Sequence, residues 1–239
     1  MGKKFFDFYF FRNLTNTNDK IKEIQKINNN SYLALYCENQ KYGRGRKGRI
    51  WESKKGDLTC SFLIRKKLNI KQLGRINLIV VSILIDIFKN LGLTQVKFKW
   101  PNDILINNRK ISGILLETNV SDNSISQFTI GIGINMHSKL RNKNYSAISL
   151  NELVTKIDPL HIFFLIVSNL YYFLDNFSNI KFNLLSEKLS RYFFDKNTLI
   201  SVLAGKRINQ GVFKKINSLG ELFLEKDNGL LKISYGEII

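Results

Sequence analysis

A glycine-rich basic loop spans residues 43–49 and reads Gly-Arg-Gly-Arg-Lys-Gly-Arg. Its three glycines lack side chains, so the backbone can approach an anion closely and present its N–H groups. Its arginines add charge and paired donors that suit phosphate or carboxylate oxygens. The loop therefore predicts an anion site, with a solvated basic loop or a nonspecific nucleic-acid contact as alternatives. It is not a Walker A loop, because no Gly-Lys-Ser or Gly-Lys-Thr closes it.

A second segment with chemical potential runs from Lys99 to Asp103 as Lys-Trp-Pro-Asn-Asp, and Lys110 follows seven residues after the aspartate. Trp-Pro-Asn-Asp between two strands favours a tight turn, and a hairpin would return Lys110 toward Asp103. A lysine and an aspartate so placed form either a structural ion pair or a catalytic pair. Spacing alone leaves both interpretations open.

Two shorter segments are compatible with ligand binding. Gly131 and Gly133 lie in a strand-like Gly-Ile-Gly-Ile-Asn run. Met136 stands where a dinucleotide fingerprint has its third glycine, so a strand that a ligand approaches closely is the better interpretation. The polar run 15–19, Thr-Asn-Thr-Asn-Asp, precedes a helical pattern. It is either an N-cap cluster or a source of hydrogen bonds for a small polar ligand.

The elements that must position these residues follow from hydrophobic periodicity. Their order predicts an α+β fold with a mixed, mostly antiparallel sheet and helices on one face, followed by a small β domain. The predicted domains are residues 1–196 and 197–239. Helices are predicted at 18–27, 73–91, 161–177 and 182–194, and strands at 5–11, 32–37, 58–64, 96–100, 104–106, 110–118, 126–135, 199–203, 211–216, 222–225 and 230–233.

Composition narrows the class of protein. The 239 residues include 37 Lys and Arg against 19 Asp and Glu, a formal net charge of +18, yet 44% are hydrophobic. That apolar content can offset the entropy of ordering, so a disordered chain is excluded. The longest apolar stretches, 78–88 and 160–174, are shorter than the ~18–20 residues that span a bilayer, so no membrane association is predicted.

The few cysteines and histidines limit the chemistry further. Cys37 and Cys60 lie in apolar strand-like runs, which favours buried thiols and a reducing, cytoplasmic compartment over a disulfide framework. His137 and His161 are the only histidines and lie in unrelated contexts. A site built from several imidazoles is therefore excluded, and no metal-binding side-chain cluster is predicted.

The order and spacing of these motifs resemble the biotin protein ligases over nearly the whole chain from about Phe8. The resemblance implies a catalytic domain like that of class II aminoacyl-tRNA synthetases and a C-terminal SH3-like β-barrel. Asn16 departs from the family's usual serine, which concerns one hydrogen bond to the biotin ring. Only about a dozen residues precede the Thr-Asn motif, so the form expected is the catalysis-only one, without an N-terminal DNA-binding domain.

The activity that the resemblance implies is formation of an amide bond in two steps. Biotin and ATP give biotinyl-5'-AMP, with Mg²⁺ as the expected cofactor, and biotin then passes to one lysine of a carrier protein. Lys110, Arg46 and Asp103 are implied as catalytic, with Asp103 as either the base of step two or an orienter of Lys110. The biotin-binding set is Asn16, Thr17, Asn18, Gln40, Arg44, Gly45, Arg46, Lys110 and Gly113; the nucleotide-binding set is Arg44, Arg46, Arg49, Trp51, Lys99, Asn102, Gly133 and Asn135.

The expected partner is the biotin carboxyl carrier protein, a subunit of acetyl-CoA carboxylase, and the expected state is a monomer or homodimer. A lipoate or octanoate ligase or transferase is the enzymatic alternative, because that family shares the general fold. A basic nucleic-acid-binding protein would explain the charge of +18. No helix-turn-helix or RRM-type aromatic signature supports it, so no specific nucleic acid is expected.

Overall fold

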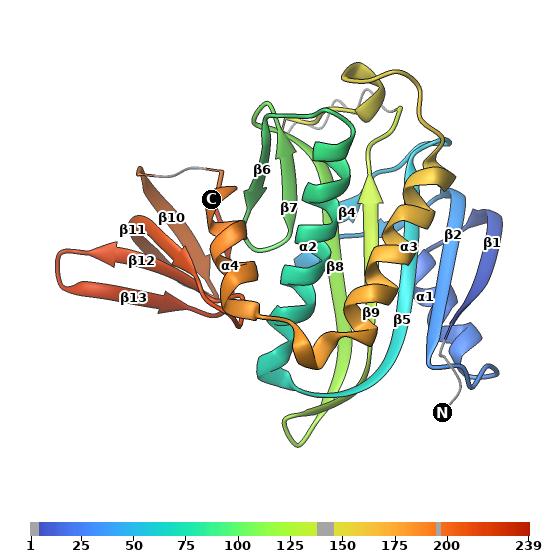
Figure 1. The fold of residues 1–239 in the computed structure, drawn as a ribbon, viewed down its shortest axis with the longest axis horizontal. Coiled ribbons are helices and arrows are strands. Elements are labelled where there is room, and N and C mark those ends of the chain that lie inside the picture. Colours follow the sequence, from blue (N-terminus) through green and yellow to red (C-terminus); the bar gives the residue numbers. More distant parts are fainter. Residues whose placement is uncertain (1–4, 138–145, 195–196) are drawn as a thin grey trace. The chain divides into compact units, whose positions relative to one another are not determined.

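The structure is a computed structural model that describes residues 5–137, 146–194 and 197–239. By its internal contacts the chain divides into two compact units. Unit 1 comprises Met1–Ile70 and Arg109–Asp175, and unit 2 comprises Lys71–Asn108 and Asn176–Ile239. Each unit is described by itself below, and Figure 1 shows their elements.

Unit 1 is built on a mixed sheet of five strands in the order β1-β2-β5-β9-β8. β1 pairs with β2 in parallel, and the other three pairings are antiparallel. This confirms the predicted mixed, mostly antiparallel sheet. The strands are β1 (Phe6–Leu14), β2 (Tyr32–Gln40), β5 (Leu58–Asn69), β8 (Arg109–Ser121) and β9 (Ser124–Ile134), and the helices are α1 (Thr17–Gln25) and α3 (Pro159–Asp175).

The helices of unit 1 cover both faces of this sheet, so the prediction of helices on one face was wrong. Ile21 and Ile24 of α1 pack with Leu33, Leu35 and Cys37 of β2. On the other face, Phe163 of α3 contacts Tyr36 and stacks on Phe62 of β5. Alternate residues of a strand point to opposite sides, and each side of these strands carries enough apolar side chains to bind a helix.

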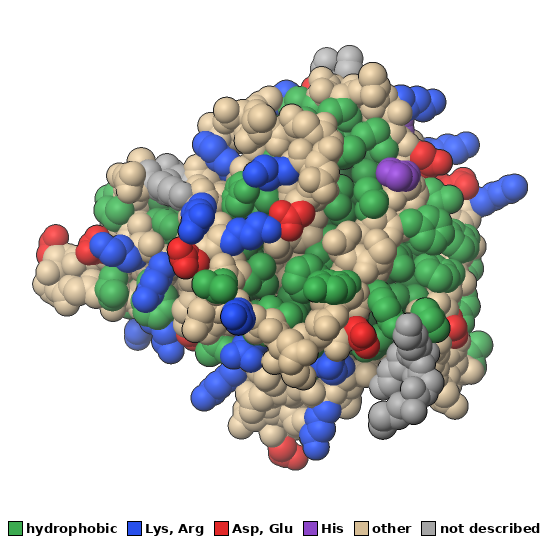
Figure 2. Space-filling view, viewed as in Figure 1, with side chains coloured by type: hydrophobic (Ala, Val, Ile, Leu, Met, Phe, Trp, Pro, Cys, Tyr) green, Lys and Arg blue, Asp and Glu red, His purple; other side chains and the backbone are tan. Residues whose placement is uncertain are grey.

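The face beneath α3 is aromatic and extends to the surface. Phe8 and Phe10 of β1 lie 5.6 and 6.3 Å, centroid to centroid, from Phe164 of α3, and all three rings are partly exposed. Figure 2 shows hydrophobic side chains gathered over α3 and the neighbouring strands. Aromatic pairs at these distances pack favourably, so they hold α3 to the edge of the sheet.

Unit 2 combines a hairpin, two helices and an antiparallel sheet of five strands in the order β13-β12-β11-β10-β14. The predicted C-terminal β structure is therefore confirmed as an antiparallel sheet. Phe193 stacks on Phe213 of that sheet with ring centroids 3.5 Å apart. The elements are α2 (Leu73–Asn90), β6 (Val96–Lys99), β7 (Asp103–Ile106), α4 (Phe182–Arg191), β10 (Leu199–Ala204), β11 (Arg207–Ile216), β12 (Leu222–Lys226), β13 (Gly229–Ile233) and β14 (Glu237–Ile238).

The C-terminal sheet packs on α4, which in turn contacts α2 of the same unit. Lys188 of α4 reaches Asp86 of α2 at 2.7 Å, and the Ser190 hydroxyl accepts a hydrogen bond from the Ile216 N–H at 3.0 Å. The predicted boundary at residue 196 adjoins residues 195–196, which lie outside the described residues, so the division 1–196 and 197–239 stays a prediction. No helix in the described part of the chain is long and apolar enough to cross a membrane.

Candidate active site

The floor of the candidate site is a strip of glycines on the α1 face of the unit 1 sheet. Gly113 of β8 lies opposite Gly133 of β9 in the strand register, and Gly131 lies two residues before Gly133. A Cβ at Gly133 would come within 2.3 Å of the Trp51 ring, and one at Gly131 within 2.7 Å of the Asn18 side chain. The floor needs glycine because an indole and an amide lie directly against its backbone.

The first turn of α1 supplies buried polar groups at one end of the floor. Asn16 is the N-cap, and its side-chain oxygen accepts from the Asp19 N–H at 3.1 Å. The Thr17 hydroxyl and backbone N–H both donate to the side-chain oxygen of Gln40, at 2.9 and 2.8 Å. Asn16, Thr17 and Gln40 are all less than a tenth exposed. The N-cap interpretation is confirmed, and Gln40 contacts the first residue of the helix.

Asn18 connects the helix to the sheet. Its side-chain oxygen accepts from the Ser61 hydroxyl at 2.6 Å, and its Nδ2 donates to Glu117 Oε2 at 2.9 Å. Because the Glu117 carboxylate can only accept, the amide nitrogen must face it, and the Ser61 hydroxyl then donates to the amide oxygen. Ser61 is fully buried opposite Gly131 in the register. Asn18 is thereby held in one orientation above the glycine floor.

The basic loop forms a short ribbon beside this floor. β3 (Gly43–Arg44) pairs antiparallel with β4 (Ile50–Trp51), and a 3₁₀ turn at Arg46–Gly48 connects them. A Cβ at Gly43 would lie 2.5 Å from the Trp51 carbonyl oxygen and 2.6 Å from Gln40 Nε2. Glycine is therefore required at this position to bring the start of the loop against the site.

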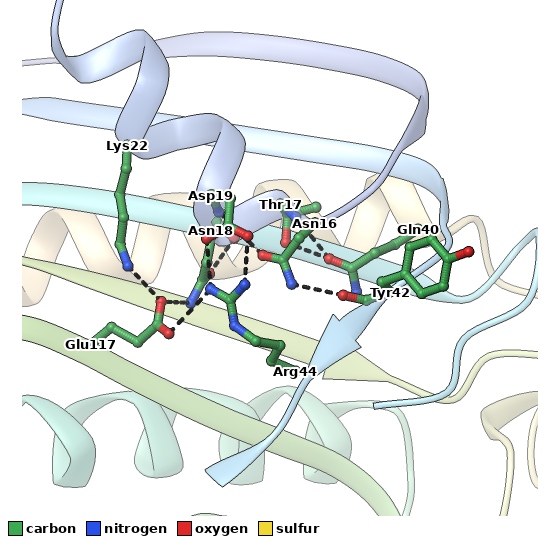
Figure 3. A network of polar contacts seen from close by, with 10 residues as sticks. Asn16, Thr17, Asn18, Asp19, Lys22, Gln40, Tyr42, Arg44 and Glu117 are labelled. Carbon is green, nitrogen blue, oxygen red and sulfur yellow. Dashed lines mark hydrogen bonds and ion pairs between the residues drawn. The ribbon is translucent and has the colours of Figure 1, made fainter. Parts of the chain in front are cut away.

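Arg44 joins the loop to α1 and β8 through a charged network, drawn in Figure 3. Its two terminal nitrogens lie 2.5 and 2.6 Å from the two oxygens of Asp19, and Nη2 also reaches Glu117 Oε1 at 3.4 Å. Lys22 Nζ lies 2.8 Å from Glu117 Oε2, the oxygen that Asn18 also contacts. The network thus joins two carboxylates, two cations and the side-chain amide of Asn18.

The network keeps its members charged. The hydrogen bond from Arg44 lowers the pKa of Asp19, and the same contact raises the pKa of Arg44. Burial opposes the charge of Glu117, but hydrogen bonds from Lys22 and Asn18 outweigh burial, and the pKa of Glu117 lies below its ordinary value. Both carboxylates are therefore acceptors at neutral pH.

Lys110 lies at the other end of the floor. Its ammonium nitrogen is 5.4 Å from the centroid of the Trp51 ring, within cation–π range. A Cβ at Gly113 would lie 2.9 Å from the Trp51 ring and 3.4 Å from Lys110 Cε. Asn135 is buried, and its Nδ2 donates to the backbone carbonyls of Lys110 and Ile148 at 3.2 and 3.3 Å. Lys110, Trp51 and the glycines are thus brought together, and Asn135 fixes the backbone behind them.

The remaining predicted residues lie in the loop ribbon and at the β6–β7 turn. Gly45, Arg46 and Arg49 lie in the loop ribbon of unit 1, where the Arg49 N–H donates to the Arg46 carbonyl at 3.2 Å. Lys99, Asn102 and Asp103 lie at the β6–β7 turn of unit 2. The indole of Trp100, in the same turn, is buried and donates to the Gly220 carbonyl at 2.9 Å within that unit.

Sequence reasoning missed three polar residues of this region, Lys22, Ser61 and Glu117, and included Asp19 only as a member of the polar run 15–19. Asp19 and Lys22 follow the Asn-Thr-Asn motif within the same helix, so helical spacing was a signal for them. Ser61 and Glu117 lie in strands, on the same side as the glycines at 131 and 113. Period-two alternation along β8 was a signal for the side on which Glu117 lies, whereas Ser61 comes opposite Gly131 only through the pairing of β5 with β9.

The sequence comparisons identify the family. The model of the biotin/lipoate A/B protein ligase family matches residues 9–135, more than half of the chain. The bifunctional ligase/repressor BirA of Escherichia coli (strain K12) is 29% identical over 206 residues, which are 83% of this chain and 63% of that protein. A biotin–[acetyl-CoA-carboxylase] ligase of Paracoccus denitrificans is 32% identical over 99 residues, 39% of this chain and 40% of that one. The chain thus spans about 63% of the length of the BirA relative.

Solved structures share the fold over almost the entire chain. A biotin protein ligase from Aquifex aeolicus in complex with biotin and ATP matches with a TM-score of 0.80 and 25% identity, covering 98% of this chain and 97% of that one. A ligase from Leishmania major in complex with biotinyl-5-AMP matches with a TM-score of 0.68 over 96% of this chain and 99% of that one; at 23% identity this likeness concerns the fold alone. With a mixed α+β fold of this kind and the family model across its motifs, the chain belongs to the biotin/lipoate A/B protein ligase family.

Proposed function

We propose that this protein is a biotin protein ligase, which activates biotin with ATP to biotinyl-5'-AMP and transfers biotin to a lysine of a biotin carboxyl carrier protein. One observation supports this most. A set of buried amides and a hydroxyl, from Asn16, Thr17, Asn18 and Gln40, shares a glycine floor with Lys110. Neutral hydrogen-bonding groups at one end and a cation at the other suit a ligand with a neutral polar ring and a carboxylate tail.

The neutral end suits a cyclic urea. Such a ring presents one carbonyl acceptor and two N–H donors and carries no charge, so it is best bound by oriented amides and hydroxyls. Asn18 is oriented by Ser61 and Glu117, and Gln40 by Thr17. Fixed partners of this kind lower the entropy cost of binding, because the site is ordered before the ligand arrives.

The charged end suits an anhydride formed from two anions. In step one the biotin carboxylate attacks the α-phosphate of ATP, and pyrophosphate leaves. Anions repel, so cations must offset the charge that develops as the new bond forms. We assign this positive charge to Lys110, Arg46 and Arg49. We assign Gly45 to the loop that covers the ligand, and Gly113, Gly133 and Trp51 to its apolar side.

Step two needs the carrier's lysine as a neutral amine. We assign Asp103 as the base that takes the proton from this lysine, with orientation of Lys110 as its alternative task. Lys99, Asn102 and Asn135 are assigned to nucleotide binding. The amine then attacks the mixed anhydride, an amide bond forms, and AMP leaves with the electron pair of the broken bond. The carrier, the monomer or homodimer state and a cytoplasmic location remain part of this proposal, as do the synthetase-like and SH3-like descriptions of the two domains.

Mg²⁺ finds no site among the described side chains alone. Residues 5–137, 146–194 and 197–239 hold no group of three His, Cys, Asp or Glu that suits an ion. The site carboxylates, Asp19 and Glu117, bind Arg44 and Lys22 instead. Mg²⁺ commonly enters nucleotide sites on the phosphates themselves with few protein ligands, so we derive no step through it.

Biotin-dependent exchange of radiolabelled pyrophosphate into ATP tests the proposal, with lipoate assayed in parallel. We expect exchange with biotin and little with lipoate, followed by transfer to a carrier domain detected with streptavidin. Exchange that prefers lipoate or octanoate would favour the enzymatic alternative. Absence of exchange with every acid, together with binding to a specific nucleic-acid sequence that persists at high salt, would favour the nucleic-acid alternative.

Lys110→Ala should reduce biotin-dependent exchange on the order of 100-fold or more, because one charge-stabilising donor is typically worth that factor. The fold should survive, since the ammonium lies beside Trp51 rather than in the core. Lys214→Ala is the matched control: Lys214 pairs with Glu225 on the C-terminal sheet, and its loss should leave exchange unchanged. Exchange near the wild-type rate in Lys110→Ala would remove this lysine from the mechanism.

A further inference from the structure

The guanidinium of Arg44 holds an ion pair with a carboxylate of α1. Both terminal nitrogens bind the carboxylate of Asp19, and Nη2 reaches Glu117 as well (Figure 3). A bidentate pair of this kind uses the fork of the guanidinium that a phosphate or carboxylate ligand would need. Arg44 can bind a ligand anion in this way only by leaving Asp19.

The position of the pair shows what it holds. Arg44 is the last residue of β3, directly before the turn that carries Arg46, and Asp19 lies in the first turn of α1. The contact therefore ties the start of the loop to the helix whose first residues hold the buried amides. Glu117 strengthens the tie, because its other oxygen binds Asn18 and Lys22.

We propose that Arg44 is a strut: it anchors the start of the basic loop to α1 and does not bind the ligand anion. Asp19 and Glu117 are then positioning residues that set where the basic loop begins. Arg46, Arg49 and Lys110 then supply the contacts to the anion. This gives Arg44 a different task from the biotin and nucleotide contacts that the family resemblance implies. The kinetic part of the inference rests on the proposed function, whereas the placement of the loop does not.

Asp19→Asn separates the two tasks because they predict opposite results. If Arg44 is a strut, its release loosens the loop and weakens binding. If Arg44 is an anion ligand restrained by Asp19, its release strengthens binding of the anion. The substitution keeps the helix start intact, since the Asn16 cap contacts the backbone N–H of residue 19 and not its carboxylate.

Limited trypsin digestion of the full chain tests whether Arg44 anchors the loop, and the readout does not depend on enzymatic activity. Arg46, Lys47 and Arg49 are cleavage sites in the loop, and the cut fragments are identified by mass. We expect cleavage there to be about 2- to 5-fold faster in Asp19→Asn, a factor that corresponds to the roughly 0.5–1 kcal/mol of an exposed pair. Glu23→Gln removes another α1 carboxylate, which pairs with Lys20 within the helix, and should cleave like the wild type. Equal rates in all three proteins would overturn the strut.

Pyrophosphate exchange then tests the consequence for the reaction. We expect Asp19→Asn, Arg44→Gln and the double variant to raise the KM for biotin by similar factors of about 2- to 5-fold with little change in kcat, because all three break one contact. A lower KM in Asp19→Asn, or an additive loss in the double variant, would overturn the proposal and make Arg44 an anion ligand. If the wild type shows no exchange with biotin, the proposed function fails while the digestion result still decides on the strut.

Discussion

The two faces of the unit 1 sheet carry different kinds of residues, although the same strands supply both faces. In β9, Thr129, Gly131 and Gly133 point to the α1 side, whereas Ile130 and Ile132 between them point to the opposite side and are buried. β5 repeats the contrast, with Ser61 toward Asn18 and Phe62 stacked on Phe163. Neighbouring residues thus serve different purposes: the α1 face, or recognition face, carries the proposed ligand site, and the α3 face packs apolar side chains against a helix. Apolar packing and the proposed site are therefore only one residue apart along each strand.

Phe62→Ala tests the α3 face and should have the largest effect on the free energy of unfolding. Phe62 is fully buried, so truncation should cost about 3–5 kcal/mol in the free energy of unfolding, through lost burial and a cavity. Denaturant unfolding measures it. Below the melting temperature the KM for biotin should stay close to the wild-type value. A small loss of stability with a large rise in KM would break the comparison.

Gly133→Val tests the recognition face one position away from Ile132. Any side chain here overlaps the Trp51 ring, and overpacking of about 1–3 kcal/mol should reduce exchange by up to roughly 100-fold. Ile132→Val is the matched control, because it changes the opposite face by one methyl group. If both variants retain exchange and lose similar stability, the glycines are structural and not part of a ligand site.

Glu117→Gln keeps the shape of the side chain but removes the charge that binds Lys22, Asn18 and Arg44. We expect the KM for biotin to rise roughly 5- to 30-fold, or about 1–2 kcal/mol, near the lower end of the range for hydrogen bonds to charged groups because the Glu117 side chain is a quarter exposed. Glu187→Gln in α4, where Glu187 pairs with Arg191, is the surface control. A KM unchanged in Glu117→Gln would show that Asn18 keeps its orientation through Ser61 alone.

The pH dependence of stability should show the smallest effect. The pKa values of Asp19 and Glu117 are lower in the folded state, so the folded state binds fewer protons than the unfolded state as pH falls. Their contribution is present above about pH 4 to 5 and is lost as pH falls through the folded pKa values. Thermal melts from pH 7 to pH 3 should therefore show a shallower acid loss in Asp19→Asn than in Glu23→Gln. Parallel curves would mean that the network adds no pH-dependent stability.

Much of the local structure could be predicted from the sequence, because each element carries its own periodic signal. The helix predicted at 73–91 is α2, and the strands predicted at 58–64 and 126–135 lie within β5 and β9 with differences only at their ends. The polar segments 15–19 and 43–49 were also recognisable, since they interrupt apolar patterns. β14, two residues long, was missed because a period cannot be read in so short a strand.

The types and order of the elements, and the motifs that mark a ligase family, can be read from the sequence alone. Which residues meet depends on how the elements pack. α1 and α3 lie on opposite faces because both sides of β2 are apolar, and composition alone does not say which helix takes which side. Glu117 joins the site through contacts to Asn18, 99 residues away in the chain, and Arg44 pairs with Asp19 across a strand and two turns. Contacts between distant residues depend on strand register and packing, and no local pattern encodes them.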